Sequence, residues 1–118
     1  MSSTREKPND ISSLIRKLGV NYPTETNAFL SFVNKTEDGK ALTVRGKELT
    51  NVGLSVAGQC DWCVATHVQH VAGAGASRDE GVEAGFMAVV MHGGPALMYM
   101  TPLLEAVDEF LPRQGDVD

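Results

Sequence analysis

Residues 60–70 read CDWCVATHVQH and contain both cysteines of this 118-residue chain, together with two of its three histidines. On a helix, Cys60, Cys63 and His67 stand at positions i, i+3 and i+7, so their side chains share one face. The same face continues with the apolar residues Val64, Val68 and Val71. We therefore predict a central helix over about residues 60–73 that carries a redox-capable cysteine pair at its N-terminus.

The segments on both sides of this helix have apolar residues at helical spacing and recognisable capping signals. Before it, helices are predicted after the cap Asp10 through Leu18, from Pro23 to the turn EDGK at residues 37–40, and from the cap Thr43 to Gly58. After it, the capping box SRDE opens a helix at Ser77, and a last helix runs from about Pro95 to Leu111 with a bend at Pro102. No segment alternates as a strand does, so the predicted fold class is an all-α bundle of about six helices.

Length and composition fit one globular domain. A chain of 118 residues can bury one core but not two. Its apolar fraction of 42% and charged fraction of 21% favour neither a disordered chain nor a membrane protein. We assign residues 10–112 to a single helical domain, and residues 1–9 and 113–118 to flexible tails.

Charge and the first residues bear on partners and location. The net charge of -5 argues against a nucleic-acid partner, because phosphate binding requires clustered Lys and Arg. The start MSSTREKPND has no apolar signal region, and no apolar run reaches membrane-spanning length. We expect a cytoplasmic protein with no membrane partner. Thiols there stay reduced, so a cysteine pair is more typical of catalysis or metal binding than of a structural disulfide.

The last predicted helix has two apolar stripes. One contains Leu97, Met100, Leu104, Val107 and Leu111, and the other contains Tyr99, Leu103, Ala106 and Phe110. A domain this small has little interior to cover both stripes, and the segment GFMAVVM at residues 85–91 adds further apolar surface. These features favour a homo-oligomer, although a well-covered helix of a monomer would show the same periodicity.

A glutamate is placed to meet the histidine of the cysteine helix. If the helices around Gly58 form an antiparallel hairpin, residues at equal distances from the turn face each other. Glu48 lies ten residues before Gly58 and His67 nine residues after it, which is about 14 Å along each helix. The sequence thus predicts that Glu48 orients the His67 imidazole, that His67 activates Cys63, and that Cys60 can close a disulfide.

Other interpretations of these residues are open at this point. Zinc could be bound by Cys60, Cys63 and His67, with His70, His92 or Glu48 as a fourth ligand, although the spacing lacks the second ligand pair of a structural zinc site. The cysteines could also be small core residues, and Glu48 a solvated helix residue. We interpret His70 and His92 as structural or exposed, and predict neither a metal nor an organic cofactor.

The pattern E-x11-C-x2-C-x3-H, formed by Glu48, Cys60, Cys63 and His67, resembles the carboxymuconolactone decarboxylase superfamily in its alkylhydroperoxidase D-like (AhpD-like) branch. The similarity extends from about Leu42 through VAGAGAS to PLLEAVDEF, roughly two thirds of the chain. It implies an all-α subunit that assembles into trimers or hexamers. It also implies reduction of small hydroperoxides, or exchange of disulfides, through the cysteine pair.

The resemblance also implies roles for the two cysteines. Cys63 would attack the peroxide, and Cys60 would resolve the resulting sulfenic acid to a disulfide. General thiol chemistry instead favours Cys60 as the thiolate, because it lies nearest the helix N-terminus. An external dithiol, from a thioredoxin-like or lipoyl protein, would restore the reduced state. Some peroxidases of the family have a further histidine between the cysteines, where this chain has Trp62.

Two alternative functions follow from the same residues. A decarboxylase-like lyase would act on a small lactone, but a cysteine pair has no evident task in that reaction. A metal-binding or oligomerisation module without catalysis would bind zinc and lack reactive thiols. We take the enzyme to be a peroxidase or disulfide oxidoreductase of the AhpD-like type.

Overall fold

The computed structural model describes residues 2–112, which form seven helices and no strand. The helices are α1 (Lys7–Asn21), α2 (Pro23–Glu37), α3 (Val44–Ala57), α4 (Asp61–Gly73), α5 (Arg78–His92), α6 (Gly94–Met98) and α7 (Met100–Phe110). The all-α prediction is confirmed, with one helix more than the approximate count of six. In this part of the chain, no helix is both long and apolar enough to cross a membrane.

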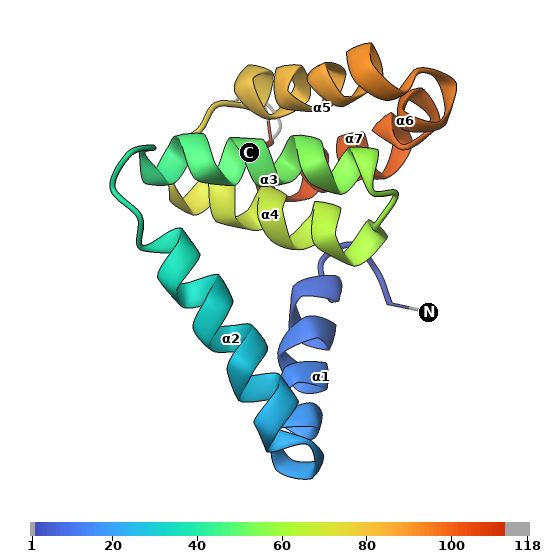
Figure 1. Cartoon of the computed structure of the whole chain (residues 1–118). Helices are drawn as coiled ribbons and strands as arrows, with labels where there is room; N and C mark the ends of the chain where they lie inside the picture. The colour runs from blue at the N-terminus through green and yellow to red at the C-terminus, as the bar shows by residue number, and fades with distance from the viewer. Residues whose placement is uncertain (1, 113–118) are drawn as a thin grey trace.

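Helices α3, α4, α5 and α7 form the body of the subunit (Figure 1). Helix α3 packs against both α4 and α5, and α4 also packs against α7. Seven large side chains are fully buried where these helices meet: Val52, Val56, Val64, Val68, Val71, Leu103 and Val107. The predicted valine stripe of the cysteine helix is therefore part of the core. Its burial fixes which face of α4 the cysteines and histidines can occupy.

Small residues let α5 approach the core closely. Its buried positions are Gly81, Gly85 and Ala88. A Cβ atom added at Gly85 would overlap the Leu103 side chain, so this glycine is required by the close approach to α7. The large apolar side chains of α5 consequently lie on its outer face, where Phe86, Met87, Val90 and Met91 are half exposed or more.

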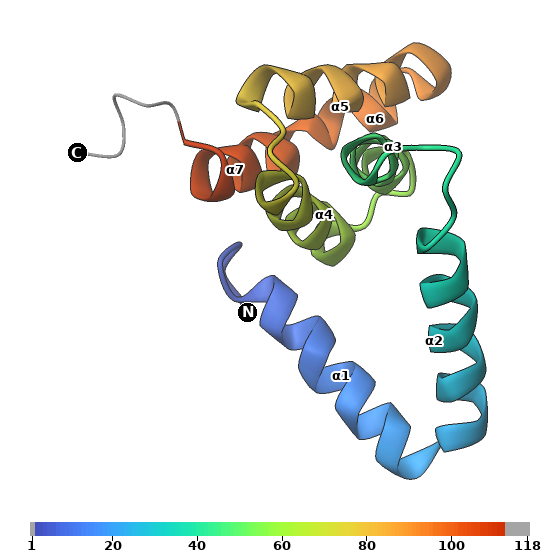
Figure 2. The same cartoon turned by 90° about the vertical axis from the view of Figure 1, so that its left-hand side faces the viewer.

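Helices α1 and α2 extend away from the body as an arm that opens in a V (Figure 2). The base of α1 contacts α4, whereas α2 contacts mainly α1. Helix α2 buries only Thr26, and its Phe29 and Phe32 are 58% and 68% exposed. A helix usually needs an apolar face packed against a neighbour to be stable in water, so this arm has an unusually bare surface for a single subunit.

The N-terminal boundary differs from the sequence prediction. Helix α1 begins at Lys7, before the expected Ile11, and ends at Asn21 rather than after Leu18. Pro8 is buried in its first turn, a position where proline needs no N–H partner, so the helix starts there and Asp10 lies inside it instead of capping it. Residues 7–9 of the expected tail are thus helical. The tail predicted for residues 113–118 lies outside the described residues.

The predicted bend at Pro102 is instead a break between two helices. Helix α6 ends at Met98, and Tyr99 separates it from α7. Pro102 then falls in the first turn of α7, where its missing N–H removes no helical hydrogen bond and its ring meets no preceding turn. The physical cause was identified correctly, but the chain relieves it by starting a new helix.

Candidate active site

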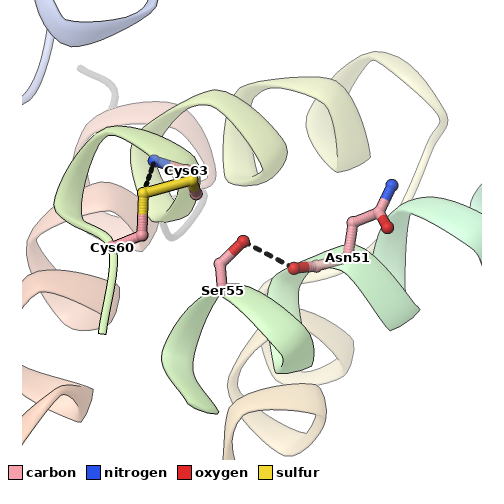
Figure 3. The surroundings of a disulfide bond; sticks show 4 residues. All are labelled: Asn51, Ser55, Cys60 and Cys63. Carbon is pink, nitrogen blue, oxygen red and sulfur yellow. Dashed lines mark hydrogen bonds between the residues drawn. A yellow bond between two sulfur atoms is a disulfide. The ribbon is translucent and has the colours of Figure 1, made fainter. Parts of the chain in front are cut away.

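The cysteine pair lies where α3 turns into α4. Cys60 is the N-cap residue of α4, and its sulfur accepts a hydrogen bond of 3.2 Å from the backbone N–H of Cys63 (Figure 3). The two cysteines form a disulfide, with Cα atoms 5.2 Å apart. Both side chains are partly exposed. The pair is thus held at the end of a helix, as predicted, and solvent can reach it.

A tight turn places the pair there. Gln59 adopts the left-handed conformation with φ of 56°, and the Cys60 N–H bonds back to the carbonyl of Ser55 at 3.2 Å. This geometry reverses the chain within three residues between Ala57 and Asp61. Helices α3 and α4 therefore run antiparallel, as the sequence predicted from the position of Gly58.

Glu48 of α3 and His67 of α4 meet across this hairpin. Glu48 Oε2 lies 2.9 Å from His67 Nδ1. The Glu48 side chain is only 11% exposed and that of His67 24%. A buried carboxylate at this distance fixes the orientation of the imidazole ring. The contact predicted from equal distances to the turn is present.

His70 is exposed, as one of its two interpretations expected, but it also approaches the same carboxylate. Its Nδ1 lies 3.4 Å from Glu48 Oε2, and its side chain is 49% exposed. The two imidazole rings stand edge to face with centroids 5.5 Å apart. The available signal was the i, i+3 spacing from His67, which places both rings over the same stretch of α3. His92, in contrast, is exposed at the end of α5.

The histidine does not bind sulfur in this oxidised state. Among the described residues, the His67 ring forms its hydrogen bond with Glu48 and with neither cysteine. Its Nδ1 is engaged by the carboxylate, which leaves Nε2 for a second partner. Because the sulfurs are joined to each other, they also offer no thiolate to a metal, so the zinc interpretation through the cysteines requires the reduced state.

The face of α3 beside the disulfide is polar. Ser55 is buried, and its hydroxyl donates to the Asn51 carbonyl at 2.6 Å rather than to sulfur (Figure 3). On α4, the Thr66 hydroxyl is buried and has no hydrogen-bond partner among the described residues. Thr66 stands three residues after Cys63 and four before His70, so a polar stripe connects the disulfide to the Glu48 cluster.

Trp62 joins the arm to α4. Its indole N–H donates to Asp10 Oδ2 at 3.1 Å, and Lys7 Nζ lies 5.8 Å from its ring centroid. Hydrogen bonds from the Ser2 hydroxyl and from the Trp62 indole lower the pKa of Asp10. Lys7 also lies 3.8 Å from Asp61. Trp62 therefore positions α1 at the cysteine end of α4 and takes no part in the Glu48 contacts.

Neither cysteine lines the two cavities beside α3. A groove of about 400 Å³ runs between α3 and α5 and is lined by apolar side chains that include Leu54, Met87 and Met91. A second cavity, of about 310 Å³, lies between α2 and α3 and is lined in part by Phe32. These hollows are next to the exposed apolar surfaces of α5 and α2.

Comparison with known proteins identifies the family that the chain matches. Residues 23–106 match the model of the carboxymuconolactone decarboxylase family. The crystal structure of an apo carboxymuconolactone decarboxylase family protein from Legionella pneumophila superposes with a TM-score of 0.84 and 34% identity, over 93% of this chain and 97% of that one. The range that matches the family model, residues 23–106, includes Glu48, both cysteines, His67 and His70.

Two curated relatives match most of this chain and are named as uncharacterised proteins. Uncharacterised protein 4 of the cox locus in Paracoccus denitrificans is 31% identical over 83 residues, which cover 70% of this chain and 75% of the relative. An uncharacterised protein of Cupriavidus necator is 29% identical over 99 residues, which cover 84% and 88% of the two chains.

Proposed function

Because this chain belongs to the carboxymuconolactone decarboxylase family, and because it has a cysteine pair at bonding distance, we propose that it is a thiol-dependent redox enzyme. Its substrates in this proposal are small hydroperoxides or disulfides. The supporting observation is the arrangement on α4: a partly exposed disulfide at the N-cap, followed on the same helix by an imidazole that a buried carboxylate orients. An activated nucleophile needs such a base and such an orienting group.

The proposed cycle starts from two reduced cysteines. His67 accepts the proton of the Cys63 thiol, and Glu48 stabilises the imidazolium that results. The Cys63 thiolate attacks the terminal oxygen of the hydroperoxide, so that an S–O bond forms and the O–O bond breaks, and the alkoxide takes the proton from His67 and leaves as an alcohol. The Cys60 sulfur then attacks the Cys63 sulfenic acid to form the disulfide, and the proton of the Cys60 thiol leaves with the displaced hydroxide as water. The two sulfurs supply the two electrons that reduce the peroxide.

An external dithiol must close this cycle. Its first thiolate attacks the Cys60–Cys63 disulfide to form a mixed disulfide, and its second thiol then breaks that bond, so that the donor becomes a disulfide and both cysteines are reduced. A thioredoxin-like or lipoyl protein has the required chemistry, and the cytoplasm is the compartment in which such donors are kept reduced. The partial exposure of both cysteines supports access by a protein donor.

Thiol titration tests this proposal directly. We expect the reduced protein to lose both of its two thiols per chain after one equivalent of an organic hydroperoxide, and to regain them on addition of a dithiol. The measurement is a count of free thiols with a thiol-reactive reagent before and after each addition. A protein whose thiols survive the hydroperoxide and also resist oxidised dithiols would contradict the redox function.

We also propose that the subunit assembles into a homo-oligomer, a hexamer or a trimer. The support is apolar surface that one subunit leaves bare. On α5 and α6, Met87, Val90, Met91 and Met98 are between 61% and 78% exposed, beside the groove between α3 and α5. Monomeric proteins rarely expose contiguous apolar patches of this kind. Burial of this patch against a neighbouring copy of the chain would give a closed ring if the rotation between copies closes.

A charge placed in this patch should dissociate the oligomer. We expect wild-type protein to have a multiple of the subunit mass, and Met91→Asp to shift it to a smaller species, because an unpaired carboxylate in an apolar interface is strongly disfavoured. Light scattering after size-exclusion chromatography measures the mass. Asn9→Asp is the matched control, since it adds the same charge to an exposed polar face of α1. A wild-type protein of single-subunit mass would contradict the proposal.

A further inference from the structure

Glu48, His67 and His70 bring three potential metal-ligand atoms together between α3 and α4. Both histidine Nδ1 atoms approach one carboxylate oxygen, Glu48 Oε2, at 2.9 Å and 3.4 Å. The three ligand atoms lie within 4.8 Å of one another. In residues 2–112, no other histidine, cysteine, aspartate or glutamate side chains form a group of this kind. The group contains no cysteine, so it exists while the disulfide is closed.

The two nitrogen-to-oxygen separations match those of a tetrahedral ion site. Two ligand atoms bound at about 2.05 Å to a tetrahedral zinc ion are about 3.3 Å apart. The two observed nitrogen-to-oxygen distances, 2.9 Å and 3.4 Å, lie on either side of this value. Two imidazoles on one such ion have ring centroids about 5 Å apart, and those of His67 and His70 are 5.5 Å apart with planes at 86°. Small side-chain shifts would therefore suffice to accommodate an ion.

Charge and access also favour a cation at this position. Among the described residues, Glu48 forms ion pairs with these two histidines and with no lysine or arginine. His70 lies in the last turn of α4, where the negative end of the helix dipole stabilises positive charge. The 49% exposure of the His70 side chain opens the cluster to solvent. The buried Glu48 carboxylate thus supplies negative charge, and a cation can reach it from the solvent beside the exposed His70 imidazole.

We propose that Glu48, His67 and His70 bind one divalent zinc-class cation. Two imidazole nitrogens and one carboxylate oxygen are a ligand set that Zn²⁺ accepts, with water in the remaining position. This site differs from one built on the cysteines, because none of its ligands changes when Cys60 and Cys63 are oxidised or reduced. The binding itself does not depend on the proposed redox activity.

Occupation of this site would interrupt the proton path of the proposed enzyme. A metal requires neutral imidazoles and an ionised carboxylate, so binding releases protons. The ion also takes Glu48 Oε2 and His67 Nδ1, the two atoms that form the hydrogen bond orienting the His67 ring. Metal binding and base catalysis by His67 then exclude each other. This consequence, that Zn²⁺ inhibits turnover reversibly, rests on the proposed function.

Titration of the oxidised protein with Co²⁺ and Zn²⁺ tests the site. With the disulfide closed and no free thiols detected, we expect one ion per chain, and a visible Co²⁺ spectrum of low coordination number without a thiolate-to-cobalt charge-transfer band. Zn²⁺ should displace the Co²⁺. His70→Ala should weaken binding at least ~10-fold, because it removes one of three protein ligands. Circular dichroism checks that the variant is folded. We expect it to fold, because the His70 side chain is half exposed.

His92→Ala is the matched control, since it removes the third histidine of the chain and leaves the cluster intact. We expect it to bind Co²⁺ as wild type does. Equal affinity in the His70→Ala and His92→Ala variants, or no binding to oxidised protein, would overturn the proposal. Binding that occurs only after reduction, with a thiolate band, would place the metal on the cysteines and overturn it as well. Each of these results leaves the thiol titration of the redox function to be judged separately.

Discussion

Cys63→Ser is expected to abolish hydroperoxide reduction, with a loss of at least ~10³-fold in turnover, because serine cannot replace the attacking thiolate. Cys60→Ser should also fail to turn over repeatedly, but for a different reason. Its Cys63 can still be oxidised once, to a sulfenic acid that has no neighbouring thiol to resolve it. We therefore expect Cys60→Ser to consume about one equivalent of peroxide per chain, and Cys63→Ser to consume none. Peroxide consumption and trapping of the sulfenic acid with dimedone measure the two results.

One feature of the structure favours the opposite assignment, with Cys60 as the attacking cysteine. The Cys60 sulfur accepts the Cys63 N–H at the N-cap of α4, the position that best stabilises a thiolate at a helix terminus. If that effect exceeds activation by His67, the roles are reversed. Dimedone adducts would then form on Cys60 in the Cys63→Ser variant. Serine is itself a favoured N-cap residue, so Cys60→Ser should retain the helix start, and a change in folding would not explain the result.

Glu48→Gln is expected to slow thiol-dependent turnover by about 10²-fold or more, because the amide keeps the shape of the side chain but loses the charge that stabilises the His67 imidazolium. The proton of Cys63 then has a weaker acceptor. We expect the rate of Cys63 alkylation by iodoacetamide, measured as a function of pH in the Cys60→Ser background, to rise at higher pH in the variant than in its parent. This pH profile reports the thiolate directly.

A purely structural role for Glu48 would leave that profile in place. Loss of the carboxylate would then lower stability or turnover without moving the pH at which Cys63 becomes reactive. That result would contradict the proposed transfer of the Cys63 proton to His67 with the help of Glu48. Glu83→Gln is a suitable control, because Glu83 is an exposed glutamate on α5 and its substitution removes the same charge. We expect the alkylation profile and turnover of this control to match those of its parent.

The central part of the site could be predicted from sequence because it depends on local spacing. The i, i+3 and i+7 positions of Cys60, Cys63 and His67 follow from helical geometry alone. The Glu48 contact required one further assumption, a tight antiparallel turn near Gly58, which the left-handed Gln59 provides. Both arguments use distances along one or two adjacent helices. They say where these residues lie, whereas their catalytic roles stay predictions.

Other features depend on packing that periodicity does not reveal. His70 was interpreted as structural or exposed, without a contact to Glu48. In the structure, the buried Glu48 carboxylate is close to both His67 and His70. The buried face of α5 is built from small residues, so its apolar pattern gives no indication that Phe86 and Met91 lie outside. The break at Tyr99 reflects a choice between bending and restarting a helix at Pro102. Which of the two occurs depends on the contacts that α6 and α7 make with the other helices.

The bare arm has a thermodynamic consequence. Because α2 buries only Thr26 within its own subunit, its folded state gains little free energy from the chain that forms it. If neighbouring subunits cover it, the order of α2 is coupled to association by mass action, and the apparent stability of this protein rises with its own concentration. Dilution would then both separate the subunits and loosen the arm whose base, through Trp62 and Asp10, is attached beside the cysteines.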